Sequence, residues 1–237
     1  MSDLYRSFLT GEGRSRPVDR WHHYFSIYEQ WLARYRQTAC VFVEIGVQAG
    51  GSLQMWRHWL GPDARIVGID IDPACAAFAE PGTRVFVGDQ SDPAFLGAVL
   101  SEIGAPDVVL DDGGHFASGM IASFETLYPA MKPDGLYLAE DANVAFWPIH
   151  NDRPDGRTFM QFVVDRIVML HDWTRHRLMF EALSTPPDKR PSFPSSEFCR
   201  TTRAIHFYDS VVVFEREPRE APWREIRPPA TESLPLP

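Results

Sequence analysis

The sequence predicts an α/β fold in which helices cover both faces of a mostly parallel sheet. Five short runs rich in Val, Ile and Leu recur between residues 41 and 141, and each is followed by apolar residues at helical spacing or by turn residues. Continuous apolar strands that alternate with helices are typical of a parallel sheet buried on both faces. Residues 204–216 form two further apolar runs joined at Asp209-Ser210, which predicts an antiparallel hairpin added to the sheet.

The predicted elements follow one another with short turns between them. Gly50 and Gly51 mark the turn after the first strand, while Pro73 and Pro93 open two helices, where proline is tolerated. Strands are expected at 41–47, 65–71, 84–89, 107–112 and 135–141, and helices at 21–36, 52–60, from 73, at 93–103 and at 119–131.

Three regions complete the expected domain organisation. Residues 1–38 form an N-terminal segment, loosely structured as far as Pro17, and a helix. The domain itself spans 39–217 and contains a helical insert at 142–202, with a long helix at about 158–183 and a loop rich in Pro and Ser at 184–198. Residues 218–237 hold six of the chain's 20 prolines, which predicts an extended or disordered tail.

The composition of the chain argues against several classes of protein. The 237 residues carry 32 acids and 23 bases, and a formal charge of −9 argues against binding to nucleic acid or to an anionic membrane. No run approaches the roughly 20 apolar residues of a membrane span. The N-terminus lacks a secretory signal and the three cysteines form no CxxC pair, so we expect a cytoplasmic protein with reduced thiols. Residues 39–145 hold 15 of the acids and only four bases.

Every predicted parallel strand ends near at least one carboxylate. Ligands of open parallel sheets bind at the carboxyl ends of the strands, so these side chains are expected to converge on one site. They are Glu44, Asp70, Asp89, Asp111, Asp112, Glu140 and Asp141. This regularity is the strongest functional signal in the sequence.

The turn after the first strand has the pattern ExGxxxGG, which departs from the GxGxxG of dinucleotide-binding proteins. Glycine allows a tight turn and a close approach by a ligand. Asp70, which ends the next strand, is placed to accept hydrogen bonds from a ribose. Glu44 would repel a pyrophosphate but suits a ligand with cationic character, such as S-adenosylmethionine. The alternative is an ordinary turn that needs glycine for packing.

The segment DDGGH (111–115) and the pair Glu140-Asp141 follow neighbouring strands. Asp112, Glu140 and Asp141, converging without a base nearby, would repel one another unless a cation lies between them. Oxygen ligands favour a hard divalent ion, Mg²⁺ with Mn²⁺ or Ca²⁺ as alternatives, over zinc. The other interpretation is that two of these acids cap the following helices, and for Asp111 we favour capping or a supporting position.

His115 lies on the same short loop as Asp112. A neutral imidazole accepts a proton near pH 7, and an alcohol becomes a better nucleophile when a cation orients it while a base removes its proton. A lone histidine is usually structural or solvated. Because this one is expected beside a metal, we interpret it as a general base.

Two other motifs leave alternatives open. Trp21-His22-His23-Tyr24 begins the helix that precedes the first strand, and packing of its aromatics with Tyr28 is the favoured interpretation over a histidine near the ligand site. Phe146-Trp147-Pro148 either stacks against the ring of an acceptor or anchors a buried loop.

Taken in order, VEIGVQAGGSLQMW, VGIDID, GDQSDPAFL, DDGGH and LYLAEDANVAFWP resemble the class I S-adenosylmethionine-dependent methyltransferases. The sequence is most similar to the metal-dependent sugar O-methyltransferases of macrolide biosynthesis, of the mycinamicin 2''-O-methyltransferase type, over about residues 20–217. The resemblance implies a Rossmann-like fold with an antiparallel C-terminal strand and places the insert on the acceptor side. The loop here reads DDGGH where the family has DDGSH.

The resemblance also implies a role for each matching residue. Asp112, Glu140 and Asp141 match metal ligands, and His115 matches the base. The expected cofactor site comprises Glu44, Gly46, Gly50, Ser52, Asp70, Asp89, Gln90 and Asp111. The expected activity is methylation of a hydroxyl on a sugar or glycosylated natural product, using S-adenosylmethionine and Mg²⁺, and a homo-oligomer stays open. Alternatives are methylation of another hydroxylated small molecule, a nicotinamide-dependent oxidoreductase and a non-catalytic cofactor-binding protein.

Overall fold

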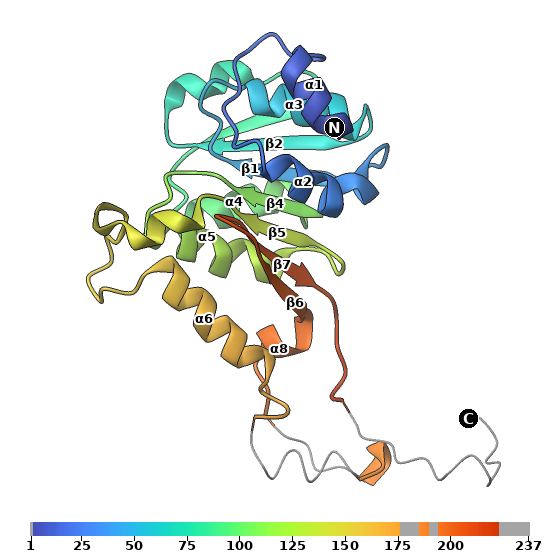
Figure 1. Cartoon of the computed structure of the whole chain (residues 1–237), viewed down its shortest axis with the longest axis vertical. Helices are drawn as coiled ribbons and strands as arrows, with labels where there is room; N and C mark the ends of the chain where they lie inside the picture. The colour runs from blue at the N-terminus through green and yellow to red at the C-terminus, as the bar shows by residue number, and fades with distance from the viewer. Residues whose placement is uncertain (1, 176–184, 190–193, 223–237) are drawn as a thin grey trace, which may run out of the picture.

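A single seven-stranded sheet forms the centre of the computed structural model, which describes residues 2–175, 185–189 and 194–222 (Figure 1). The strand order is β3-β2-β1-β4-β5-β7-β6; β1 to β5 are parallel, and β7 is antiparallel to both of its neighbours. The strands are β1 (Val41–Ile45), β2 (Arg65–Asp70), β3 (Thr83–Val87), β4 (Val108–Asp111), β5 (Leu136–Ala139), β6 (Thr202–Phe207) and β7 (Val212–Arg216). The predicted mixed α/β fold is confirmed.

Helices lie on both faces of the sheet. The α-helices are α1 (Asp3–Thr10), α2 (Tyr24–Leu32), α3 (Gly51–Leu60), α4 (Pro93–Ile103), α5 (Ala117–Ala130), α6 (Phe159–Leu170) and α8 (Glu197–Thr201). Short 3-10 helices are η1 (Ala33–Tyr35), η2 (Pro73–Phe78), η3 (Ala142–Phe146), η4 (Pro148–His150) and η5 (Pro187–Lys189). Buried residues of α1, α2 and α3 form one core cluster and those of α4, α5, α6 and α8 another.

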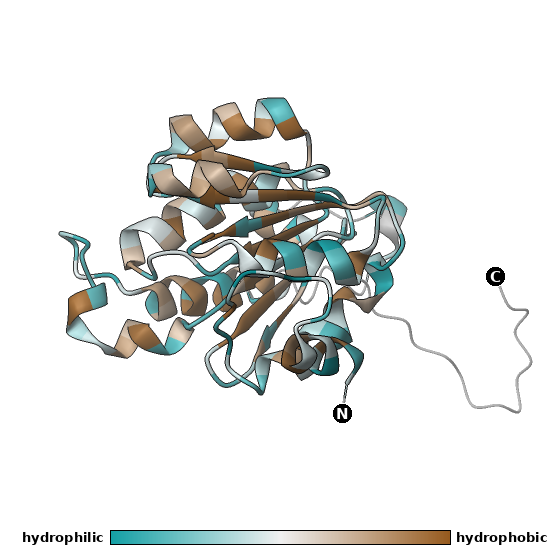
Figure 2. Cartoon of the chain, turned by 90° about the horizontal axis from the view of Figure 1, so that it is seen from above, coloured by the Kyte–Doolittle hydropathy of each residue, from teal (hydrophilic) through white to brown (hydrophobic). Residues whose placement is uncertain are grey.

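Alternation along the strands divides their side chains between these two clusters. In β1, Val43 and Ile45 face α4 and α5, whereas Phe42 faces α2 and α3. Seen from above, the apolar strands lie between the two helical layers (Figure 2). Successive side chains of a strand point to opposite faces, so the residue that follows each strand also has a fixed face. This alternation decides where the acids at the strand ends point.

The N-terminal segment differs from the prediction. Residues 1–17 were expected to be loosely structured, but α1 packs on the sheet with Leu4 fully buried and Phe8 against Phe25. The side chain of Ser2 accepts a hydrogen bond from the backbone N–H of Tyr5 and caps this helix. The prediction was wrong because frequent polar residues hide a short apolar stripe on α1.

Two predicted helices are shorter than expected. The segment after Pro73 is a 3-10 helix, because only a few residues separate β2 from the turn at Glu80–Thr83. Helix α6 begins with a capping box at Thr158 and ends at Leu170, where the prediction extended it to about 183. Residues 176–184 of that prediction, and 223–237 of the predicted tail, lie outside the described residues. Within the described ranges, no helix combines the length and apolar character needed to cross a membrane.

Candidate active site

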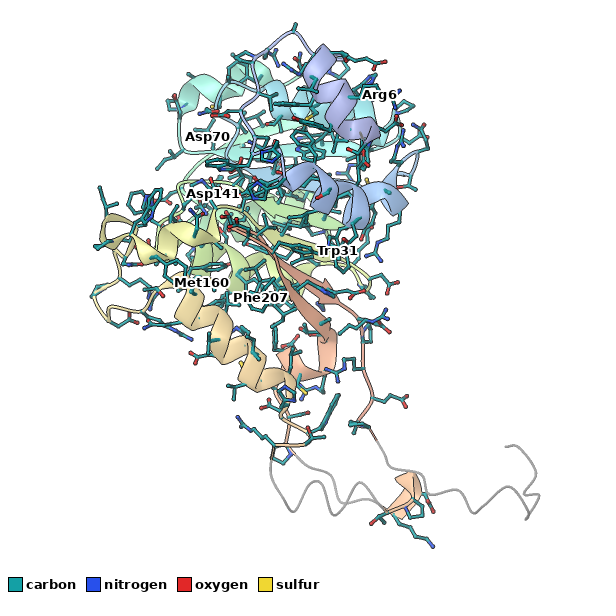
Figure 3. All side chains as sticks on the ribbon, in the orientation of Figure 1. Arg6, Trp31, Asp70, Asp141, Met160 and Phe207 are labelled. Atoms are coloured by element: carbon teal, nitrogen blue, oxygen red, sulfur yellow. The ribbon has the colours of Figure 1, made fainter. Side chains whose placement is uncertain are left out.

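A cavity of about 970 Å³ opens at the carboxyl ends of the parallel strands. Its size suits a cofactor together with part of an acceptor. The predicted site residues that line it are Gly46, Ser52, Asp70, Asp89, Gln90, Asp112, His115, Glu140 and Asp141. Glu44, Gly50 and Asp111 do not line it. In Figure 3, the labelled residues Asp70 and Asp141 lie at the same end of the strands.

The glycine turn after β1 brings two strand ends into close contact. Gly46 has a φ of +93°, and a Cβ at this position would lie 2.0 Å from the carbonyl oxygen of Asp112. Only glycine fits both the backbone conformation and the space. The first strand can therefore approach the DDGGH loop, which closes one wall of the cavity.

Substitution Gly46→Ala is expected to lower the free energy of unfolding by about 2 kcal/mol or more, because the loop must move to admit the methyl group. Urea unfolding followed by circular dichroism measures this change. Gly97→Ala is the control: Gly97 lies inside α4 with no atom within 4 Å of the added Cβ. There we expect a gain of roughly 0.5–1 kcal/mol. Equal stability of Gly46→Ala and the unaltered protein would contradict the account of this turn.

Asp70 binds the backbone of the same turn. Its Oδ2 accepts N–H groups from Val47 at 2.8 Å and Gln48 at 3.0 Å, and its Oδ1 accepts the N–H of Asp72 at 2.9 Å. Burial raises the pKa of Asp70, but these backbone donors outweigh it and hold the pKa below its ordinary value. The lowered pKa keeps the carboxylate ionised, and an ionised carboxylate can accept a hydroxyl from a ligand.

Glu44 is fully buried behind the cavity wall. Its carboxylate accepts hydrogen bonds from Ser52 Oγ at 2.8 Å and Trp56 Nε1 at 3.2 Å, and it pairs with Arg20 Nη2 at 2.6 Å. Burial raises the pKa of Glu44 to about 7, although Arg20 acts in the opposite direction. Glu44 was expected to face a ligand with cationic character, but in this structure Arg20 supplies the positive charge beside it.

Three acids gather on the face of the sheet that α2 covers. Asp111 of β4 pairs with Ala139 of β5, so Asp112 and Glu140 are the next neighbours on adjacent strands. Alternation points both toward α2, as it does for Glu44 on β1. Burial raises the pKa of Asp112 and of Glu140. The charge of Asp112 raises the pKa of Glu140 further, and the charge of Asp141 raises that of Asp112.

Arg20 lies among these acids, which corrects the expectation that no base is nearby. Its Nη1 pairs with Asp112 at 2.7 Å, and its Nε lies 3.7 Å from a carboxylate oxygen of Glu140. Only 9% of the side chain is exposed. Burial would lower the pKa of Arg20, but Asp112 and Glu140 outweigh burial and raise the pKa well above its ordinary value.

Asp141 and His115 complete the site from two left-handed backbone positions. Their φ angles are +49° and +55°, a conformation that non-glycine residues seldom adopt. The Nε2 of His115 lies 3.5 Å from an oxygen of Asp141 and 3.7 Å from one of Asp112. Candidate ligand atoms of these three residues all lie within 4.8 Å of one another. Two facing carboxylates fit a hard divalent cation. The predicted ligand Glu140 is not in this group, and its carboxylate instead contacts Tyr28 and Arg20.

Asp111 and Gln90 support the loop from behind. Asp111 is fully buried and accepts hydrogen bonds from Tyr137 Oη at 2.6 Å and Gln90 Nε2 at 3.1 Å. Gln90 Oε1 accepts the backbone N–H of Gly114 at 3.0 Å. Burial raises the pKa of Asp111 to about 6. The geometry agrees with the supporting position that we favoured for Asp111.

No family model matches the chain. The chain is 33% identical over 219 residues to the 8-demethyl-8-alpha-L-rhamnosyl tetracenomycin-C 2'-O-methyltransferase of Streptomyces olivaceus, covering 88% of this chain and 54% of the relative. It is 29% identical over 202 residues to the mycinamicin VI 2''-O-methyltransferase of Micromonospora griseorubida, covering 82% and 48%. The chain spans about half the length of these curated relatives.

A solved structure decides the fold family. The MycE methyltransferase from the mycinamycin biosynthetic pathway, in complex with Mg, SAH and mycinamycin VI, superimposes with a TM-score of 0.74 at 25% identity. The match covers 94% of this chain and 55% of that chain. The chain has the class I methyltransferase fold. Its curated relatives are sugar O-methyltransferases that act on glycosylated natural products.

Several residues around the cavity of this methyltransferase fold were not predicted correctly. Arg20 was missed, whereas Tyr24 and Tyr28 pack as predicted. The prediction did not include the hydrogen bond that each tyrosine also donates to an acid, Tyr24 to Asp141 and Tyr28 to Glu140. Two tyrosines four residues apart in an apolar helix share one face, which is the sequence signal that was available.

The remaining motifs are also placed. Trp21 lines the cavity and is 60% exposed, whereas neither His22 nor His23 is among the lining residues. Phe146 and Trp147 are exposed, so they do not form a buried anchor. Of the two alternatives for these aromatics, contact with an acceptor is the one that their exposure permits.

Proposed function

We propose that this chain transfers the methyl group of S-adenosylmethionine to a hydroxyl of a sugar on a glycosylated small molecule, assisted by Mg²⁺. One observation carries the proposal. The glycine turn and Asp70, which suit the cofactor, line the same cavity as Asp112, His115 and Asp141, which suit a cation and a base. The named activities of the two relatives support a sugar hydroxyl as the acceptor.

The cofactor side of the cavity would be formed by the turn after β1 and the ends of β2 and β3. Asp70 Oδ1 is available to the ribose hydroxyls, and the close packing at Gly46 leaves backbone at the cavity wall. Asp89 lines the cavity at the next strand end, while its Oδ1 accepts the N–H of Ser91 at 2.7 Å. S-adenosylmethionine brings an activated methyl group and its own leaving group.

The acceptor side would be formed by the DDGGH loop and the end of β5. Asp112, Glu140 and Asp141 would hold the cation, which lowers the pKa of a hydroxyl that it contacts. His115 Nε2 would take the hydroxyl proton as the oxygen forms its bond to the methyl carbon and the carbon–sulfur bond breaks. Positioning and stabilisation of charge then supply most of the rate enhancement.

An assay for methyl transfer tests the proposal. Glycosides that carry rhamnosyl or related sugars are incubated with the full chain and S-adenosylmethionine, and S-adenosylhomocysteine is measured. We expect turnover with Mg²⁺, its loss with EDTA and its return when Mg²⁺ is added in excess. Turnover that continues unchanged in EDTA would show that the reaction needs no metal. If the protein binds no S-adenosylhomocysteine, the proposal of methyl transfer is wrong.

A further inference from the structure

The acids of the candidate metal site are contacted by a short part of the chain that lies outside the strands and loops of the α/β unit. Arg20, Tyr24 and Tyr28 come from the segment before β1, and together they contact all three acids. Arg20 pairs with Asp112 at 2.7 Å, Tyr24 Oη donates to Asp141 at 2.5 Å and Tyr28 Oη donates to Glu140 at 2.5 Å. We propose that these three residues are positioning residues, which orient the three acids to hold one divalent cation. This inference rests on the proposed function.

The geometry of α2 directs the hydroxyl groups of both tyrosines toward the acids. Tyr24 and Tyr28 lie one helical turn apart, so their side chains share a face, and they reach the consecutive residues Glu140 and Asp141. Both tyrosine side chains are almost fully buried. A buried phenol that donates to a carboxylate fixes the orientation of that carboxylate and adds no charge of its own.

Packing holds the two tyrosines in place. The ring of Tyr28 meets that of Trp56 edge to face, with centroids 5.1 Å apart, and the ring of Tyr24 meets that of Tyr28 at 6.2 Å. Trp56 in turn donates to Glu44. Closely packed side chains keep one rotamer, so the two hydroxyl groups stay within hydrogen-bond distance of Asp141 and Glu140.

Arg20 contributes charge as well as position. Its guanidinium contacts Glu44 and Asp112 and lies near Glu140, whereas Asp141 accepts a hydrogen bond from Tyr24. One positive charge among four carboxylates leaves the group anionic. Asp112 and Asp141 line the cavity, where a divalent cation would offset part of the remaining negative charge.

Removal of single hydroxyl groups tests the inference. Tyr24→Phe and Tyr28→Phe are made separately in the full chain, and binding of Mg²⁺ and of S-adenosylhomocysteine is measured by calorimetry. Loss of a group that orients a metal ligand weakens metal binding by about 10-fold to 100-fold. We expect this loss for Mg²⁺ in both variants, with affinity for S-adenosylhomocysteine unchanged.

Tyr35→Phe is the matched control. Tyr35 follows α2, and its hydroxyl donates to the backbone carbonyl of Asp134 at 2.8 Å, away from the cavity. This variant should bind Mg²⁺ as the unaltered protein does.

Each outcome is decisive. Unaltered Mg²⁺ affinity in both site variants overturns the positioning assignment and leaves the proposed function intact. Loss of both ligands together also overturns it, because the tyrosines would then serve the fold in general. Failure of the unaltered protein to bind Mg²⁺ overturns the metal-assisted function and this inference with it.

Discussion

Replacement of His115 by alanine is expected to lower kcat by about 100-fold to 10,000-fold, the usual contribution of a general base. His115 lines the cavity with its Nε2 atom near both Asp112 and Asp141. Its side chain is 19% exposed, so a ligand in the cavity can reach it. Initial rates of S-adenosylhomocysteine formation at saturating acceptor measure the change. His171→Ala, at an exposed position just after α6, is the control and should keep full activity.

A second measurement separates a base from a metal ligand. His115 lies close enough to both acids to contact a bound cation itself. If it acts as the base, the alanine variant keeps its Mg²⁺ affinity while its kcat falls. A parallel loss of Mg²⁺ binding would instead assign the histidine to the metal.

Replacement of Arg20 by methionine is expected to lower the free energy of unfolding by about 3–5 kcal/mol, as when one partner of a buried ion pair is removed. The substitution leaves Glu44, Asp112 and Glu140 close together without their counterion. Urea unfolding measures the loss. Added Mg²⁺ should restore part of the stability, because a ligand that binds only the folded state stabilises it.

Arg16→Met is the matched control for Arg20. Arg16 belongs to the same N-terminal segment and pairs with Glu80 at 2.7 Å, but both of these side chains are partly exposed. Ion pairs of that kind contribute about 1 kcal/mol or less. Equal effects of the two substitutions would show that the buried position of Arg20 has no special importance.

Much of the candidate site followed from the period of the strands. Apolar runs placed Asp70, Asp112 and Glu140 at the ends of parallel strands, and parallel strands end at one edge of a sheet. Alternation along β1 places Phe42 and Val43 on opposite faces of the sheet. Glu44 lies on the same face as Phe42 and points toward α2. These features are local in sequence, so a single sequence is enough to predict them.

The counterion was harder to predict because it depends on tertiary docking. Arg20 lies in a polar stretch without periodicity, and its contact with Glu44 joins residues 24 positions apart. Counting bases within 39–145 could not reveal it. The available signal was Glu44 itself, since an acid inside an apolar strand requires a buried partner from elsewhere in the chain.

The path of the N-terminal segment also bears on how the protein can be divided. Pro17 crosses directly over Gly51, where a Cβ would lie 2.1 Å from the proline carbonyl oxygen. A fragment that starts at residue 39 would keep all seven strands and the acids at their ends, yet lack Arg20, Tyr24 and Tyr28. The two pieces, 2–38 and 39 onward, therefore form a natural pair for split-protein complementation, in which reassembly would be read out as recovered cation binding.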